Sequence, residues 1–222
     1  MVYRLYGAPD FANFAVHCVL AELGQPHEAV FLDVAAGALK TPAHLARHPL
    51  GLVPALDTPE GPIFETAAIL LWLADRHGGG LAPAPADPDR GTFLSWLFFT
   101  SNSLHTVVMD LLHPYRAAGE ALARPVAETA HARLRERLAL IDRAAAGRPR
   151  WLSPENPGIV GIYLAMLLRW TQQCPAHADL AISVRDFPSL HAIAAACETR
   201  PAILRVAAEH GLAGRFLTDP ET

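Results

Sequence analysis

The sequence predicts an α/β domain at residues 1–77 and an all-α domain at residues 89–222, joined by a linker at residues 78–88. Strand-like and helical segments alternate in the first part, whereas apolar residues recur only at helical spacing after the linker. The linker holds three glycines and three prolines, which cannot continue a helix. A chain of 222 residues is long enough to form two such cores.

The α/β domain is predicted from short apolar runs separated by turn residues. The expected strands are 2–6, 27–33, 53–57 and 62–64, and the expected helices are 13–23, 42–47 and 65–76. Gly24 follows the first helix as a C-terminal cap residue. A strand–helix–strand unit, a hairpin and a closing helix together predict a mixed four-stranded sheet with helices on both faces.

Helices alone are expected after the linker. They cover residues 90–113, 125–146 and 158–170, and two more begin at Pro188 and Pro201. The segment 158–170 is almost entirely apolar, so it should be the buried central helix. The tail beyond Gly211 is expected to be irregular.

Composition excludes several classes of function. With a net charge of −4 and a pI near 6.2, the chain gives no electrostatic reason to bind nucleic acid or an anionic membrane. No apolar run is long enough to span a bilayer, and the N-terminus lacks the features of a signal peptide. Cys18, Cys174 and Cys197 are predicted to be buried thiols of a reducing cytoplasm. The eleven histidines are scattered without metal-ligand spacing, which favours surface or capping roles and no metal site.

The stretch His48–His77 indicates a binding site. Pro54 interrupts an apolar strand, and a cis Val53–Pro54 bond would free the Val53 backbone N–H and C=O for a bound peptide. Glu65 and Thr66 open the next helix, and the unpaired N–H groups of a helix start suit a carboxylate ligand.

This stretch, H-P-L-G-L-V-P-A-L followed by E-T and an apolar helix, resembles the glutathione transferase family. The resemblance implies that Val53 and Pro54 hold the cysteinyl backbone of glutathione and that Glu65 and Thr66 hold its γ-glutamyl end. It also implies a thioredoxin-like α/β N-terminal domain plus an all-α C-terminal domain. Leu52 stands where Gln or Lys is common in the family.

The second half is most similar to the family's bacterial beta-type branch. The matching segments are Trp96–His105, Ile162–Trp170 and Glu198–Ala202. One departure is that Gly158 and Gly161 occupy the positions of the usual capping box of the buried helix. We expect Asn156 to cap that helix instead, one residue before Pro157.

Glutathione chemistry requires a thiolate, and a free thiol of pKa about 8.5 is mostly protonated at neutral pH. In the family the activating donor lies in the stretch that is residues 6–13 here, yet this stretch has neither Ser nor Cys. The beta-type Cys position falls on Phe11 or Ala12. Two donors remain: Asn13, which could instead only cap the helix, and Tyr6, which could instead belong to the core. Asp10 is a poor candidate, because a carboxylate beside sulfur opposes the thiolate.

The resemblance extends the site to further residues. Phe11, Leu52 and His105 are expected beside glutathione, although a lone His on a long helix is often simply packed. Phe11, Met109, His113 and Trp170 are expected to form the pocket for a hydrophobic substrate, with plain core packing as the alternative.

The function expected from these features is that of a cytoplasmic, homodimeric glutathione S-transferase, with glutathione as co-substrate and no metal. It would conjugate glutathione to a hydrophobic electrophile, as in detoxification, and could also act as a glutathione-dependent peroxidase or disulfide reductase. The alternative is a glutathione-binding regulatory module without catalysis. A purely structural helical bundle is a third interpretation, which leaves the Val53–Thr66 pattern without a role.

Overall fold

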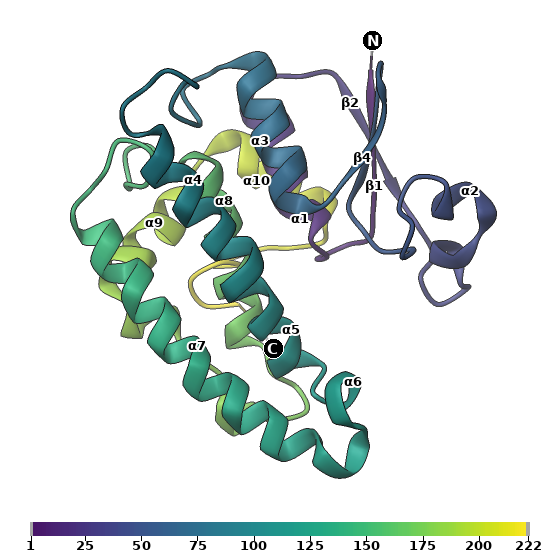
Figure 1. Ribbon diagram of the computed structural model, residues 1–222, viewed down its shortest axis with the longest axis vertical. Coiled ribbons are helices and arrows are strands. Elements are labelled where there is room, and N and C mark those ends of the chain that lie inside the picture. The colour runs from purple at the N-terminus through teal and green to yellow at the C-terminus, as the bar shows by residue number, and fades with distance from the viewer. Residues whose placement is uncertain (1, 221–222) are drawn as a thin grey trace.

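The structure is a computed structural model that describes residues 2–220. A sheet with its helices lies on one side of the molecule, and a bundle of longer helices lies on the other (Figure 1). Between His77 and Arg90 the chain forms neither helix nor strand. The domain boundaries at 77 and 89 remain a prediction that agrees with this arrangement.

The sheet has four strands in the order β2-β1-β3-β4, with β1 parallel to β2 and antiparallel to β3. The mixed sheet expected from the sequence is therefore confirmed. Its strands are β1 (Tyr3–Gly7), β2 (His27–Phe31), β3 (Ala55–Thr58) and β4 (Gly61–Phe64). The third strand begins two residues later than expected, at Ala55, because Pro54 has no N–H to donate to a neighbouring strand. The Val53–Pro54 bond is cis, as the sequence suggested.

Three helices cover the sheet. They are α1 (Asn13–Glu22), α2 (Pro42–Leu45) and α3 (Thr66–His77). Helices α1 and α3 lie on the side of the helical bundle, and α2 lies on the far side (Figure 1). Alternation along β1 divides its side chains accordingly: Leu5 joins the core with α1 and α3, whereas the Tyr6 ring meets His44 of α2.

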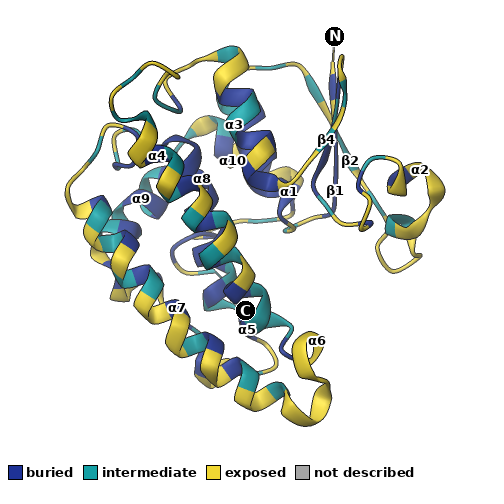
Figure 2. Cartoon of the chain, in the orientation of Figure 1, coloured by how far each residue is buried: buried dark blue, intermediate teal, exposed yellow. Residues whose placement is uncertain are grey.

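The remaining helices form the second part. They are α4 (Arg90–Phe98), α5 (Thr106–Leu112), α6 (Tyr115–Ala118), α7 (Ala123–Ala146), α8 (Gly158–Gln172), α9 (Pro188–Glu198) and α10 (Pro201–Glu209), with short 3-10 turns at Glu120–Leu122, Ala178–Leu180 and Val184–Asp186. Another 3-10 turn, Ala38–Lys40, precedes α2 in the first part. Exposed and buried residues alternate along α7, as expected for an amphipathic surface helix (Figure 2). No helix within residues 2–220 combines the length and the apolar character needed to cross a bilayer.

The expectation of one regular helix over residues 90–113 is wrong. A π-helix, Phe99–His105, separates α4 from α5. The Thr100 hydroxyl donates to the Trp96 carbonyl at 2.8 Å, and such bonds back to the preceding turn bend helices. Because π-helical segments often occur at functional sites, His105 at the end of this segment is a candidate site residue.

Helix α8 is buried along most of its length, as predicted. Its expected cap is wrong, however: the Asn156 amide donates to the carbonyls of Gly80 and Arg150 instead. The N–H of Ile159 is satisfied by the Leu81 carbonyl at 2.9 Å. Gly158 has φ of 59°, and a Cβ there would lie 2.8 Å from the Leu81 oxygen, so only glycine allows this close approach.

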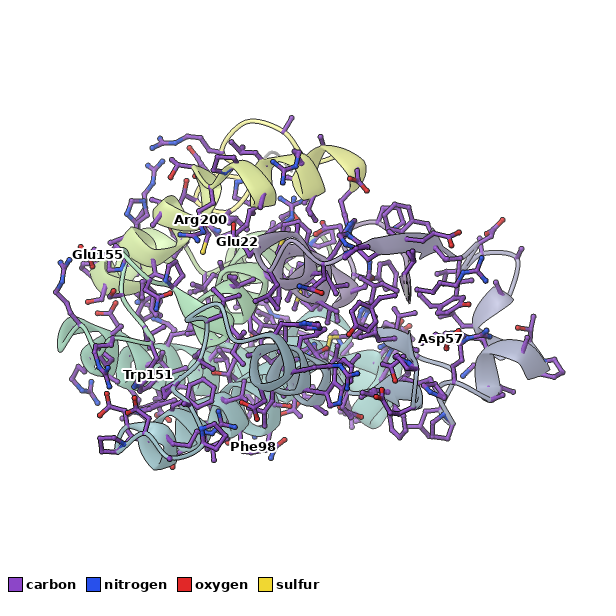
Figure 3. The ribbon with its side chains drawn as sticks, turned by 90° about the horizontal axis from the view of Figure 1, so that it is seen from above. Glu22, Asp57, Phe98, Trp151, Glu155 and Arg200 are labelled. Carbon is purple, nitrogen blue, oxygen red and sulfur yellow. The ribbon has the colours of Figure 1, made fainter. Side chains whose placement is uncertain are left out.

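The C-terminal region holds the two parts together. Arg200, just before α10, pairs through Nε with the Glu22 carboxylate of α1 at 2.9 Å, and Figure 3 shows these side chains next to each other. The tail is irregular as expected, yet Phe216 is buried and the Glu198 carboxylate accepts the Thr218 N–H at 2.7 Å. The three cysteines are free and buried, as predicted.

Candidate functional site

Asn13 lies at the turn between β1 and α1. It is the first residue of α1, and Ala12 occupies the cap position, so the alternative that Asn13 merely caps the helix is wrong. Its Oδ1 accepts the backbone N–H of Ala8 at 3.0 Å. A Cβ on Gly7 would lie 2.0 Å from the Asn13 Cγ, so the amide is clamped against the end of the strand. With its oxygen engaged in this way, the Asn13 amide offers its Nδ2 hydrogens as donors.

Asp10, in the same turn, is held by α8. Arg169 donates to both carboxylate oxygens, at 2.9 and 2.8 Å, and the Trp170 indole N–H lies 3.3 Å from Oδ1. Asp10 has φ of 57°, a conformation that non-glycine residues rarely adopt. The carboxylate is therefore neutralised by a buried guanidinium and fixes the turn to the helical domain. The sequence suggested only turn chemistry here, because Arg169 is 159 residues away.

Tyr6 belongs to a different environment. Its hydroxyl donates to the Asp57 carboxylate at 3.2 Å, and the Arg47 guanidinium lies 4.2 Å from its ring centre. Burial and the negative charge of Asp57 raise the pKa of Tyr6. Figure 3 places Asp57 at the end of the molecule that carries the sheet and α2. Of the two candidate donors, the geometry favours Asn13.

The backbone before Pro54 is shaped by a histidine that the sequence did not single out. His44 is buried and its Nε2 lies 2.8 Å from the Leu52 carbonyl oxygen. Its Nδ1 has no partner within the described residues. The Leu52 side chain is 48% exposed, and Val53 precedes the paired part of β3. The N–H and C=O of Val53 therefore lie outside the strand ladder.

The start of α3 follows the β3–β4 hairpin. Glu65 has φ of 74° and an exposed side chain, and Thr66 behind it is buried. A strained non-glycine residue at a helix start is common in ligand sites, where surrounding structure holds it in place. The Glu65 carboxylate and the first N–H groups of α3 form a polar corner with both acceptors and donors.

The helical domain contributes His105, the last residue of the π-helix. Its Nδ1 is 2.7 Å from the Tyr163 hydroxyl oxygen, and its ring centre is 5.6 Å from that of Trp170. Burial lowers the pKa of His105 to about 4, so the imidazole is neutral at neutral pH. The sequence analysis did not single out Tyr163, although a lone tyrosine in an apolar helix was the available signal.

The residues expected to hold a hydrophobic substrate lie on three elements. Phe11 is 42% exposed beside Asp10, and Trp170 is partly buried on α8. Met109 lies on α5, His105 ends the π-helix before it, and His113 follows α5 directly. Their assembly into one pocket remains a prediction.

Two further histidines connect this turn to α10. The Asp10 N–H donates to His210 Nδ1 at 3.1 Å, and His210 Nε2 lies 3.1 Å from His17 Nδ1. Burial lowers the pKa of His210 to about 4 and that of His17 to about 3. The expectation of surface or capping roles is therefore wrong for this pair. Across residues 2–220, no three His, Cys, Asp or Glu side chains are grouped as a metal site.

Comparison with known proteins agrees with this geometry. Residues 1–75 match the family model of the glutathione S-transferase N-terminal domain. Glutathione S-transferase GST-4.5 of Xanthomonas campestris pv. campestris is 30% identical over 185 residues, which cover 80% of this chain and 86% of that protein. Maleylacetoacetate isomerase of Rhizobium meliloti is 40% identical over 105 residues, covering 46% of this chain and 45% of that protein.

Solved structures agree as well. A sphingomonad glutathione S-transferase complexed with glutathione is 32% identical, with a TM-score of 0.75 over 95% of this chain and 100% of its own. The bacterial glutathione S-transferase BphK in its ternary complex is 27% identical, with a TM-score of 0.76 over 94% of this chain and 100% of its own. These matches show that this chain belongs to the glutathione S-transferase family.

Proposed function

We propose that this protein conjugates the thiol of glutathione to a hydrophobic electrophile. Conjugation is the activity of its family, and a relative of 32% identity was solved with glutathione bound. The observation that carries the proposal is the position of Val53 just ahead of the β3 ladder, with Glu65 and Thr66 at the far end of the same hairpin. An unpaired backbone edge and a helix start suit the two ends of a γ-linked peptide.

In this proposal Val53 pairs with the cysteinyl backbone of glutathione. The γ-glutamyl carboxylate meets the N–H groups at the start of α3, where the helix dipole favours a negative charge. The Glu65 carboxylate accepts hydrogen bonds from the γ-glutamyl ammonium group, and Thr66 supplies a hydroxyl beside it. Leu52, Phe11 and His105 border the bound peptide, and Pro54 fixes the chain direction at Val53.

Thiol activation falls to Asn13 and the start of α1. An amide N–H donated to sulfur stabilises the thiolate relative to the thiol, and the positive end of the α1 dipole acts in the same direction. The thiolate then attacks the electrophilic carbon. With a chlorodinitrobenzene a carbon–sulfur bond forms, the carbon–chlorine bond breaks, and chloride leaves with the electron pair. Such catalysis by positioning and electrostatics requires no metal.

The second substrate would bind between Phe11, Met109, His113 and Trp170, where apolar and aromatic side chains suit a hydrophobic electrophile. We place the enzyme in the cytoplasm, in keeping with its three free buried thiols. A homodimer would use exposed apolar side chains, of which Phe64 and Phe98 are 39% and 47% exposed. An amide donor leaves sulfur open to oxidants, so glutathione-dependent peroxidase or disulfide reductase activity is a second reaction to assay.

The experiment compares turnover of chlorodinitrobenzene by the wild type, Asn13→Ala and Tyr6→Phe. A hydrogen bond to a charged group contributes about 1.5–3 kcal/mol, so Asn13→Ala should lower kcat/KM by about tenfold to a hundredfold. Tyr6→Phe should lower it little, because the Tyr6 hydroxyl is bonded to Asp57. Unchanged turnover in Asn13→Ala together with a large loss in Tyr6→Phe would reverse the assignment.

The second candidate function is a glutathione-binding regulatory module without transfer activity. Two observations favour it: the turn lacks Ser and Cys, and Asn13 is only 1% exposed. Retention on glutathione resin is expected under both functions, whereas turnover above the uncatalysed rate is expected only of the enzyme. A protein that is retained but gives no turnover with chlorodinitrobenzene, peroxide or a disulfide would support the regulatory module.

A further inference from the structure

Tyr163 is a buried phenol in the middle of the apolar helix α8. Its side chain is 1% exposed, and its neighbours Ile162 and Leu164 are buried and apolar. A phenylalanine would fill the same space without a hydroxyl to desolvate, and an unbonded buried hydroxyl is costly. The Tyr163 oxygen lies 2.7 Å from His105 Nδ1, and the two rings meet edge to face at 5.7 Å.

Helix α8 packs against α3 as well as against the π-helix. Burial raises the pKa of Tyr163, and the hydroxyls of Ser101 and Thr66 act on it in the opposite direction. The Tyr163 hydroxyl therefore bonds His105 of the π-helix from a helix that also contacts α3. The start of α3 is the proposed site of the γ-glutamyl end of glutathione, and His105 is proposed to border the same peptide.

We propose that the Tyr163 hydroxyl is a positioning group for glutathione, which holds the Thr66 hydroxyl and the His105 imidazole in place at the seam between the two domains. This inference rests on the proposed function, because it assigns Thr66 to the γ-glutamyl end. A free hydroxyl rotates among several orientations, and a partner that fixes it lowers the cost of ordering it when the ligand binds. Tyr163 acts at the peptide end of the site and Asn13 at the sulfur, so the two should affect different kinetic constants.

The test begins with Tyr163→Phe, which keeps the ring and removes one oxygen. The Kd for glutathione, measured by calorimetry, and the KM for glutathione should both rise about threefold to tenfold, the effect of one lost hydrogen bond. The value of kcat at saturating glutathione should stay within about twofold, since an interaction that contributes equally before and during reaction alters KM alone.

Tyr3→Phe is the matched control. Tyr3 is also buried, and its hydroxyl lies 2.9 Å from Nε2 of a histidine, His77, at the far end of α3 from Thr66. This variant should bind glutathione like the wild type. If it loses affinity as much as Tyr163→Phe does, the effect is a general loss of packing order, and the positioning role is overturned.

A double-mutant cycle with Thr66→Val tests whether Tyr163 acts through Thr66. Coupled residues give non-additive effects, so the double variant should bind glutathione no more than about twofold weaker than Thr66→Val alone. Fully additive losses would overturn the inference. If the wild type itself fails to bind glutathione, the proposed function fails and this inference with it. If the wild type binds and Tyr163→Phe binds equally well, only this inference fails.

Discussion

Replacing Asn13 with Asp separates the two tasks of this side chain. The aspartate has the same shape, and its oxygen still accepts the Ala8 N–H, which is 3.0 Å from the present amide oxygen. The side-chain amide nitrogen of Asn13, an N–H donor, is replaced by a carboxylate oxygen. Close packing against Gly7 prevents the side chain from turning away. A negative charge therefore replaces a donor beside the proposed position of the glutathione sulfur.

The size of the effect follows from Coulomb's law. Two like charges about 4 Å apart repel by about 4 kcal/mol at an effective dielectric constant of about 20. One pKa unit corresponds to about 1.4 kcal/mol, so the upper limit is about three units. Allowing for solvent near the site, we expect the thiol pKa of bound glutathione to rise by about one to two units.

The assay is the pH dependence of kcat/KM with chlorodinitrobenzene. The thiolate is the reactive form, so activity rises through the thiol pKa, and this inflection should move upward by the same one to two units. At pH 7 the rate should fall by about tenfold to a hundredfold, with recovery at high pH. Asn156→Asp controls for the added charge, because the Asn156 side-chain amide donates to the carbonyls of Gly80 and Arg150 and not into the β1–α1 turn. An identical inflection in Asn13→Asp and the wild type would refute the role of Asn13 as the sulfur donor.

Three further predictions concern stability. Asp10→Ala leaves the buried α8 guanidinium without its carboxylate and should lower the free energy of unfolding by about 3 kcal/mol, measured by urea denaturation; an unchanged midpoint would contradict the role of this pair. The depressed pKa values of His17 and His210, about 3 and about 4 against 6.5, mean that the unfolded chain binds more protons below pH 6.5. Stability should therefore fall as pH drops from 6.5 toward 4, and the double Gln variant should show a flatter pH dependence of the unfolding free energy; equal slopes would exclude these histidines as the cause. Gly158→Ala should lower the thermal midpoint through backbone collision, whereas Gly91→Ala, with open space around it in α4, should not lower it; equal effects would show that the close approach at residue 158 is unimportant.

Much of the architecture was predictable because it depends on local patterns. Alternation and turn residues located the four strands of the mixed sheet, and helical spacing located α7 and the buried α8. The π-helix was not predictable in this way, because its apolar spacing resembles that of an ordinary helix. The cap of α8 was also missed, since the carbonyl that satisfies the Ile159 N–H comes from Leu81, in the linker.

The same contrast between local patterns and distant contacts applies to the candidate site. Two residue pairs, Val53–Pro54 and Glu65–Thr66, lie within one short segment of the chain. The sequence therefore indicated a binding site for a small peptide ligand. What the sequence left open was the choice between Asn13 and Tyr6. Tertiary structure favours Asn13, because pairing within the sheet directs the Tyr6 hydroxyl to Asp57.

The sequence by itself therefore determined the fold class and the edge proposed to face glutathione, since the patterns that indicate them are local. Only the folded chain showed the contacts of Asp10 with Arg169 and of Tyr163 with His105. These contacts join residues separated by 159 and 58 positions. Their formation depends on how whole helices pack, and no local spacing in the sequence records it.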